Sequence, residues 1–155
     1  MNVSKLFLSL SAVALLALAT TSAEAGYPRQ YYGNWSYYPQ RSYYYTTYYY
    51  KPTPTYSTYS YHYCIYYPSR PRYVYYYNPH RGYYWGRCDL QGKPGEQYSL
   101  LAETDRKANL DEIPESAFPK PAAMPAVPES KDGVANSDGE QIDTPPTPPQ
   151  EAPAQ

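Results

Sequence analysis

The chain has 155 residues, of which 24 are tyrosine and 18 are proline, and its formal net charge at pH 7 is −1. After residue 25, the strong core formers Leu, Ile, Val and Phe together number 11. That is roughly 8% of the remaining chain, well under the ~20% below which a highly charged chain is usually disordered. So few aliphatic side chains do little to offset the conformational entropy of folding, which excludes a conventional single-core enzyme. We therefore expect a non-enzymatic protein.

Residues 1–25 have the layout of a secretory signal peptide. Lys5 precedes an apolar run from Leu6 to Ala19, and Ala23-Glu24-Ala25 provides a cleavage motif of small residues. The run is shorter than the ~20 apolar residues that a transmembrane helix needs. The sequence thus predicts cleavage after Ala25 and a secreted protein, located in a periplasm, at the cell surface or outside the cell. No membrane span is expected in the mature chain.

Export makes the two cysteines, Cys64 and Cys88, candidates for a disulfide. Two unpaired thiols, or bonds between chains, are the alternatives to an internal bridge. If the strands expected around them were neighbours in chain order, their Cα atoms would lie two strands, or about 10 Å, apart, beyond the ~7 Å limit for a bridge. Either the first and third strands are adjacent or the bridge is absent, and the sequence does not decide between the two.

The charge of the chain divides at Cys88. Residues 26–88 carry seven cations and no acids, whereas residues 89–155 carry thirteen acids and five cations. Within the cationic half, residues 26–55 consist of tyrosine blocks in polar spacers, which predicts a low-complexity arm without stable structure. Residues 103–155 are acidic and rich in proline, which predicts a disordered tail.

Residues 56–102 have the pattern of short strands. Tyr and Ile recur with period two from Tyr59 to Tyr67, and 72–77, 83–90 and 97–102 are further candidate strands. The segment Asn78-Pro79-His80-Arg81-Gly82 suits a tight turn. We expect a small all-β antiparallel meander of three or four short strands here, in a chain that is otherwise mostly disordered.

The stretch Arg72-Tyr-Val-Tyr-Tyr-Tyr-Asn-Pro79, followed by Trp85, resembles the second strand, turn and second tryptophan of a WW domain. Such domains bind proline-rich peptides on an aromatic groove. The resemblance is local, since no Leu-Pro-x-Gly-Trp strand precedes it and Trp85 arrives about one position early. It supports a small aromatic module for a glycan or a proline-rich peptide, with the binding residues Arg72, Tyr75, Tyr77, Tyr84 and Trp85. The chain's own proline-rich tail could fill such a groove.

The tyrosine blocks, Tyr84-Trp85-Gly86-Arg87 and the segment Ile113-Pro-Glu-Ser-Ala-Phe-Pro119 together look like secreted tyrosine-rich bacterial proteins. This resemblance spans most of the chain. It implies secretion and no particular activity.

A metal site is a third hypothesis, and its soft-ligand candidates are His62, Cys64, His80 and Cys88. Their spacing matches no closed zinc pattern such as paired Cys-x-x-Cys motifs. Thiols in an oxidising compartment are more often bonded to each other. We therefore expect no metal and no other cofactor.

Tyrosine itself is the strongest functional signal, because 23 of the 24 lie between Tyr27 and Tyr84. Each ring offers a flat apolar face and one hydroxyl, and interleaved arginines can stack on such rings. Many weak contacts of this kind favour adhesion and self-association. The first hypothesis is therefore a non-enzymatic structural or adhesive protein that self-assembles or cross-links through dityrosine. Its expected partner is a second copy or a cell-surface polysaccharide rather than nucleic acid, because the cations are sparse.

Overall fold

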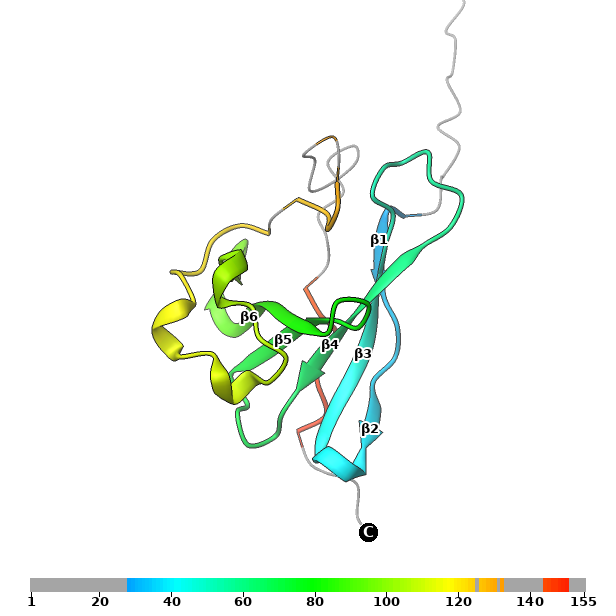
Figure 1. The fold of residues 1–155 in the computed structure, drawn as a ribbon. Coiled ribbons are helices and arrows are strands. Elements are labelled where there is room, and N and C mark those ends of the chain that lie inside the picture. Colours follow the sequence, from blue (N-terminus) through cyan, green and yellow to red (C-terminus); the bar gives the residue numbers. More distant parts are fainter. Residues whose placement is uncertain (1–27, 125, 131, 133–143, 151–155) are drawn as a thin grey trace, which may run out of the picture.

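A computed structural model describes residues 28–124, 126–130, 132 and 144–150. They form one antiparallel sheet that curls into a half-barrel (Figure 1). Its strands are β1 (Gln30–Tyr32), β2 (Ser36–Tyr38), β3 (Tyr43–Tyr50), β4 (Ser60–Tyr66), β5 (Tyr73–Asn78), β6 (Tyr83–Lys93) and β7 (Glu96–Leu100). Single 3-10 turns are η1 (Pro39–Arg41), η2 (Glu103–Asp105), η3 (Leu110–Glu112) and η4 (Glu115–Ala117). In this described part, no helix is long and apolar enough to cross a membrane.

The strand order is β1-β3-β4-β5-β6-β7, and β2 also pairs with β3. The long strand β3 therefore holds two short strands along one side: β2 pairs with residues 43–45 and β1 with residues 48–50. From β3 to β7, strands that follow one another in the chain are neighbours in the sheet. Antiparallel neighbours need only short connections, which fits the turn-rich sequence between them.

The prediction of a mostly disordered chain with a meander confined to residues 56–102 is wrong. Strands β1, β2 and β3 lie in the segment 26–55 that was expected to be an unstructured arm. Strand β3 buries every second side chain, from Tyr44 to Tyr50. Because tyrosine rings bury large apolar areas, they replace the aliphatic residues whose scarcity suggested disorder.

The expected turn after β5 is present in the structure. The backbone N–H of Gly82 donates to the carbonyl of Asn78 at 2.8 Å. The Asn78 side-chain oxygen also accepts from the backbone N–H groups of His80 and Arg81, at 2.9 and 3.1 Å. Gly82 has a φ of 70°, in the left-handed region that glycine adopts without a Cβ clash.

Each face of the sheet carries its own aromatic core, and we name the faces after two residues of β5. The Tyr76 face buries Tyr44, Tyr48, Tyr50, Cys64, Tyr66, Val74, Tyr76, Trp85, Cys88 and Tyr98, together with Val127. The Tyr75 face buries Ile65, Tyr75 and Tyr84 beneath Leu101, Leu110 and Ile113. Each face of the sheet therefore has a buried apolar layer, although the low content of aliphatic residues in the chain had not suggested one.

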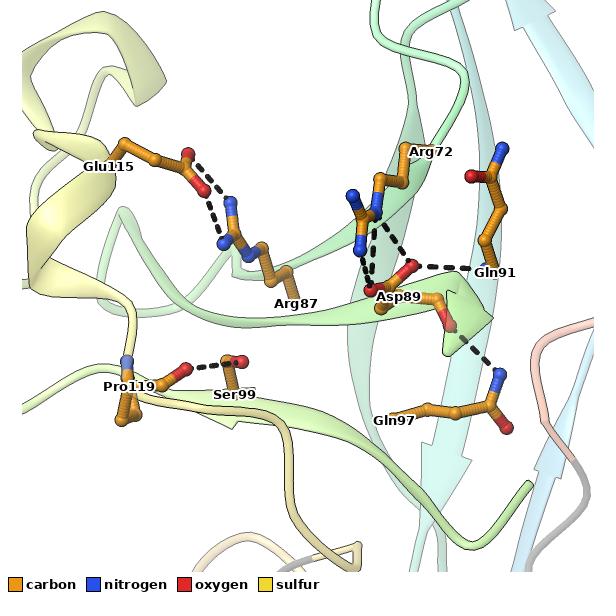
Figure 2. Close-up of polar contacts among 8 residues, drawn as sticks. All are labelled: Arg72, Arg87, Asp89, Gln91, Gln97, Ser99, Glu115 and Pro119. Atoms are coloured by element: carbon orange, nitrogen blue, oxygen red, sulfur yellow. Dashed lines mark hydrogen bonds and ion pairs between the residues drawn. The ribbon is translucent and has the colours of Figure 1, made fainter. Parts of the chain in front are cut away.

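Residues 101–118, which we call the strap, cover the Tyr75 face. Arg87 on β6 donates two hydrogen bonds to the carboxylate of Glu115, at 2.8 and 2.5 Å (Figure 2). Its guanidinium also lies over the rings of Tyr73 and Phe118, at 3.9 and 4.0 Å from their centroids. Ser99 on β7 donates to the carbonyl of Pro119 at 2.8 Å. The tail expected to be disordered from residue 103 is therefore docked on the sheet over this first stretch.

A β-bulge in β6 decides where Trp85 lies. Tyr76 pairs with Gly86 and Tyr77 pairs with Tyr84, so Trp85 is an extra residue between the two pairs. The Trp85 ring packs on Tyr76, with ring centroids 4.8 Å apart. Gly86 lies close to β7, and a Cβ there would come within 2.9 Å of the Ser99 carbonyl oxygen. The glycine thus lets β7 approach the bulge closely.

We predict that Gly86→Ala lowers the free energy of unfolding by about 1–3 kcal/mol, because its methyl group would meet backbone rather than a movable side chain. Gly33→Ala is the matched control, since a Cβ at Gly33 would meet atoms at ordinary contact distances, from 3.6 Å. Urea unfolding of both variants measures the difference. Equal midpoints for the two variants would contradict the account of the bulge.

Candidate functional site

The predicted binding residues Tyr75, Tyr77 and Tyr84 do lie together, on the Tyr75 face. The ring centroids of Tyr77 and Tyr84 are 5.0 Å apart, and those of Tyr75 and Tyr84 are 6.4 Å apart. Tyr75 and Tyr84 are buried, with exposed fractions of 3% and 6%. Phe118 of the strap lies 6.3 Å from the Tyr75 ring. These tyrosines therefore pack against the strap instead of lining an open groove.

The structure places the other two predicted binding residues elsewhere. Trp85 lies on the opposite, Tyr76 face. Arg72 forms an ion pair with Asp89 at 2.7 Å, and this hydrogen-bonded pairing lowers the pKa of Asp89 (Figure 2). Tyr84 belongs to the core of the Tyr75 face and Trp85 to that of the Tyr76 face, so the two do not contribute to one surface. The predicted set is thus split among three places.

The predicted disulfide is not present, because Cys64 and Cys88 are both free thiols. Strand β5 lies between their strands, β4 and β6, so the strands are neighbours in chain order. This is the arrangement for which the sequence analysis expected no bridge. Cys64 pairs across the sheet with Tyr76, and Cys88 pairs with Val74. Burial raises the pKa of Cys64 well above 9 and that of Cys88 to about 12. Both thiols therefore stay protonated at neutral pH and act as small apolar core groups.

The four metal-ligand candidates do not gather at one place. His62, Cys64 and Cys88 are buried on β4 and β6, whereas His80 lies in the exposed turn, 4.9 Å from the Tyr61 ring. Among the residues that the structure describes, no three His, Cys, Asp or Glu side chains form a metal-binding group. Burial, together with the nearby His80 and Arg81, lowers the pKa of His62 to about 4. His62 is therefore a neutral imidazole at pH 7.

His62 and Trp85 line a pocket of about 260 Å³ beside the turn that joins β5 and β6. Asn78 and Tyr83, which pair at the end of these strands, contribute further walls. The rest of the lining comes from the turn, from Leu100 at the end of β7, and from residues 103–106 and 126–129. The pocket thus lies where the end of the sheet meets two segments that follow it in the chain.

Two lining side chains carry a buried nitrogen that has no hydrogen-bond partner, Nε1 of Trp85 and Nδ1 of His62. The other ring nitrogen of His62, Nε2, lies 3.3 Å from the Tyr50 hydroxyl. Leaving a buried polar group unpaired costs about 1–3 kcal/mol, and such groups are rare in folded proteins. A ligand that reaches these nitrogens after a small shift of the surrounding side chains would relieve that cost.

Charged side chains at the pocket balance one another. Arg81 and Arg106 contribute two cations, and Glu103 and Glu129 contribute two carboxylates. The Arg106 guanidinium lies 5.6 Å over the Tyr83 ring, and its Nε donates to the carbonyl of Leu101 at 3.3 Å. The pocket therefore offers many hydrogen-bonding groups without a net formal charge.

The sequence analysis named Trp85 as a binding residue and His62 as a candidate metal ligand, but it did not place the two in one site. Their meeting depends on the bulge at Trp85, for which Gly86 is the only local signal. Arg106 and Glu129 come from the predicted disordered tail, where no pattern marks them. Comparison of the chain with protein-family models, curated proteins and solved structures finds no match.

We predict that stability falls as the pH is lowered from about 6.5 to 4. In this window the unfolded chain binds a proton at His62 and the folded chain does not, which corresponds to about 3 kcal/mol of lost stability. The carboxylates of Asp89 and Glu115, whose folded pKa values are lowered, reduce stability only below about pH 4.5.

Urea unfolding at a series of pH values measures this dependence. His62→Gln should flatten the curve between pH 6.5 and 4.5. His80→Gln removes a neighbour that lowers the pKa of His62 but leaves the burial of His62 in place, so this variant should still lose stability in the same window. The same slope in His62→Gln and wild type would show that His62 is not the titrating group.

Proposed function

We propose that the chain is a non-enzymatic binding module that holds a neutral, polyhydroxylated ligand, a single sugar or a short glycan, in the pocket beside His62 and Trp85. The observation that carries this proposal is the pair of buried, unpartnered nitrogens at one pocket. Ligand pockets commonly combine aromatic walls with a few convergent polar groups, as this one does.

Sugar hydroxyls suit the hydrogen-bonding requirements of these two nitrogens. The indole N–H of Trp85 is only a donor, whereas Nδ1 of His62 is a donor or an acceptor depending on the tautomer. A hydroxyl group both donates and accepts, so neighbouring hydroxyls satisfy both nitrogens in either tautomer. Arg81 and Glu103 add donors and acceptors at the exposed side of the pocket.

Size and charge also favour a sugar over an anion. The pocket's volume of about 260 Å³ lies just below the ~300–1,000 Å³ typical of drug-sized ligands. Such a volume suits one or two sugar rings. An anion would gain little from a lining with two cations and two carboxylates around a neutral imidazole. The signal peptide predicted for residues 1–25 would place the module where polysaccharides are exposed.

Binding of sugars to the full chain tests this proposal by calorimetry and thermal unfolding, with a panel of soluble monosaccharides and disaccharides. Trp85→Phe keeps an aromatic ring but removes the indole N–H, so we expect it to weaken binding about tenfold. His80→Gln, close to the pocket but not part of it, should bind as wild type does.

Acetate and phosphate form the contrasting arm of the same experiment. Stabilisation by these anions alone, with none by the sugars, would overturn the assignment of a neutral ligand. Equal sugar affinity in Trp85→Phe and wild type would show that the sugar binds elsewhere.

A second candidate function is adhesion or cross-linking through surface tyrosines, and one observation favours it. On the outer strands, the Tyr31 ring stacks on Tyr49 at 4.7 Å and meets Tyr59 edge-on at 4.9 Å. The Lys51 ammonium lies 4.7 Å over the Tyr59 ring. Such an aromatic and cationic strip is suited to weak contacts with a second surface.

Exposure predicts which tyrosines cross-link when a peroxidase and hydrogen peroxide remove one hydrogen atom from each phenol. Tyr31, Tyr38 and Tyr56 are 39%, 39% and 47% exposed, and we expect dityrosine at these positions. The fully buried Tyr48 and Tyr76, whose pKa values burial raises well above 10, should stay unmodified. Peptide mapping by mass spectrometry locates the products. Cross-links at the buried rings instead would contradict this assignment.

A further inference from the structure

Residues 144–150, near the C-terminal end, contact the start of the sheet. The indole N–H of Trp35 donates to the carbonyl of Pro146 at 3.0 Å, across 111 residues of sequence. Trp35 lies between β1 and β2 and packs against the core of the Tyr76 face. Its ring is 6.3 Å from that of Tyr66. In Figure 1 this segment, in red, passes behind the sheet.

The burial pattern of this segment has a period of three. Pro145 and Pro148 are buried, whereas Pro146 and Thr147 between them are exposed. A polyproline II helix has three residues per turn, so residues three apart lie along the same edge. Proline also restricts φ to the value this helix requires. The spacing of the two buried prolines is the spacing of residues along one edge of such a helix.

This arrangement corresponds to a known mode of peptide recognition. Domains that bind proline-rich peptides dock a preformed polyproline helix on an aromatic surface, at little entropic cost. Here the indole N–H of Trp35 is the donor on the protein surface, and the carbonyl of Pro146 is the acceptor on the segment. Pro145 and Pro148, three residues apart, are the buried prolines. No backbone strand pairing is needed, because the carbonyls of such a helix are free to accept.

We infer that the surface around Trp35 is a docking site for the segment Thr144-Pro-Pro-Thr-Pro-Pro149, and that a second copy of this chain can supply that segment in place of the chain's own. The chain's own segment is seated on this surface, and every copy carries the same sequence. Asp132 and Thr144 are 12 residues apart in the sequence, a separation that corresponds to a reach of at most about 40 Å. This site is separate from the pocket beside His62 and Trp85.

The chain's own segment competes with the segment of a second copy for the surface around Trp35. This competition sets the protein concentration at which the two segments exchange. A tethered segment has an effective concentration on the order of millimolar, so dilute protein keeps its own segment docked. Copies brought together at millimolar local concentration exchange their segments and form chains or closed dimers. The surface around Trp35 thus promotes a self-association that depends on protein concentration.

A pair of full-length variants tests the exchange. In P145A/P148A the two buried prolines are lost but the Trp35 surface is kept, whereas in Trp35→Phe the indole donor is lost but the segment is kept. Mixed together, the two should form a one-to-one complex by analytical ultracentrifugation, because each supplies what the other lacks. Each alone should be monomeric. A mixture that contains only monomers would overturn exchange between copies.

A synthetic peptide of residues 144–150 tests the docking site itself, and the Trp35 indole N–H signal in nitrogen-15 NMR spectra reports on it. We expect P145A/P148A to shift this signal and the peptide to restore it. In wild type the peptide carries a paramagnetic tag, which broadens the Trp35 signal when the peptide replaces the protein's own segment. This should need roughly tenfold more peptide than in P145A/P148A, because the protein's own segment competes. A peptide with alanine at positions 145 and 148 should have no effect, whereas one with alanine at the exposed position 147 should act like the native peptide.

Absence of any peptide effect on the indole signal of P145A/P148A would overturn the docking site. The wild-type titration needs no altered protein, so it decides the question even if a variant fails to fold. A tagged peptide that leaves the wild-type Trp35 signal unbroadened at tens of millimolar would have the same meaning.

Discussion

The sheet depends on burying large tyrosine rings, among them Tyr48 and Tyr76, whose hydroxyls have partners. Tyr48 and Tyr76 are almost fully inaccessible, and their rings meet edge-on at 5.9 Å. The Tyr76 hydroxyl lies 2.7 Å from that of Tyr32, and the Tyr48 hydroxyl donates to Gln30. A phenol is large enough to replace a branched aliphatic residue, but its hydroxyl must be paired when it is buried. For these two rings, hydroxyl partners on strand β1, a second tyrosine and a glutamine, meet that requirement.

The cationic half of the chain before Asp89 and the acidic half that follows Cys88 are joined by ion pairs within the molecule. Arg29, Arg70 and Arg87 from the cationic half form ion pairs with Asp132, Asp111 and Glu115 from the acidic half. In the pair of Arg87 the guanidinium is buried between two rings, and Glu115 is its carboxylate partner. A buried cation that loses its partner is costly, so this contact holds the strap on the Tyr75 face. That strap closes the aromatic surface on which a WW-like groove was expected.

Local chemistry made part of the fold predictable. The period-two run around Tyr63 and the turn from Asn78 to Gly82 depend on neighbours in sequence, and both are present in the structure. The sequence analysis did not predict strand β3, because a count of aliphatic side chains leaves out the apolar area that tyrosine rings bury in a core. The candidate pocket was missed because the bulge at Trp85 depends on how closely β7 approaches Gly86, a contact between different strands.

The sequence by itself determined the strand around Tyr63, the turn from Asn78 to Gly82 and the separation of charge along the chain, because each is a property of neighbouring residues. Only the tertiary structure decided that Cys64 and Cys88 stay apart and that Trp85 joins His62 at a pocket. It also decided that Pro146 meets Trp35. These outcomes depend on strand order, on a register shift and on a contact across 111 residues. Such features arise from the packing of the whole chain, which no local pattern encodes.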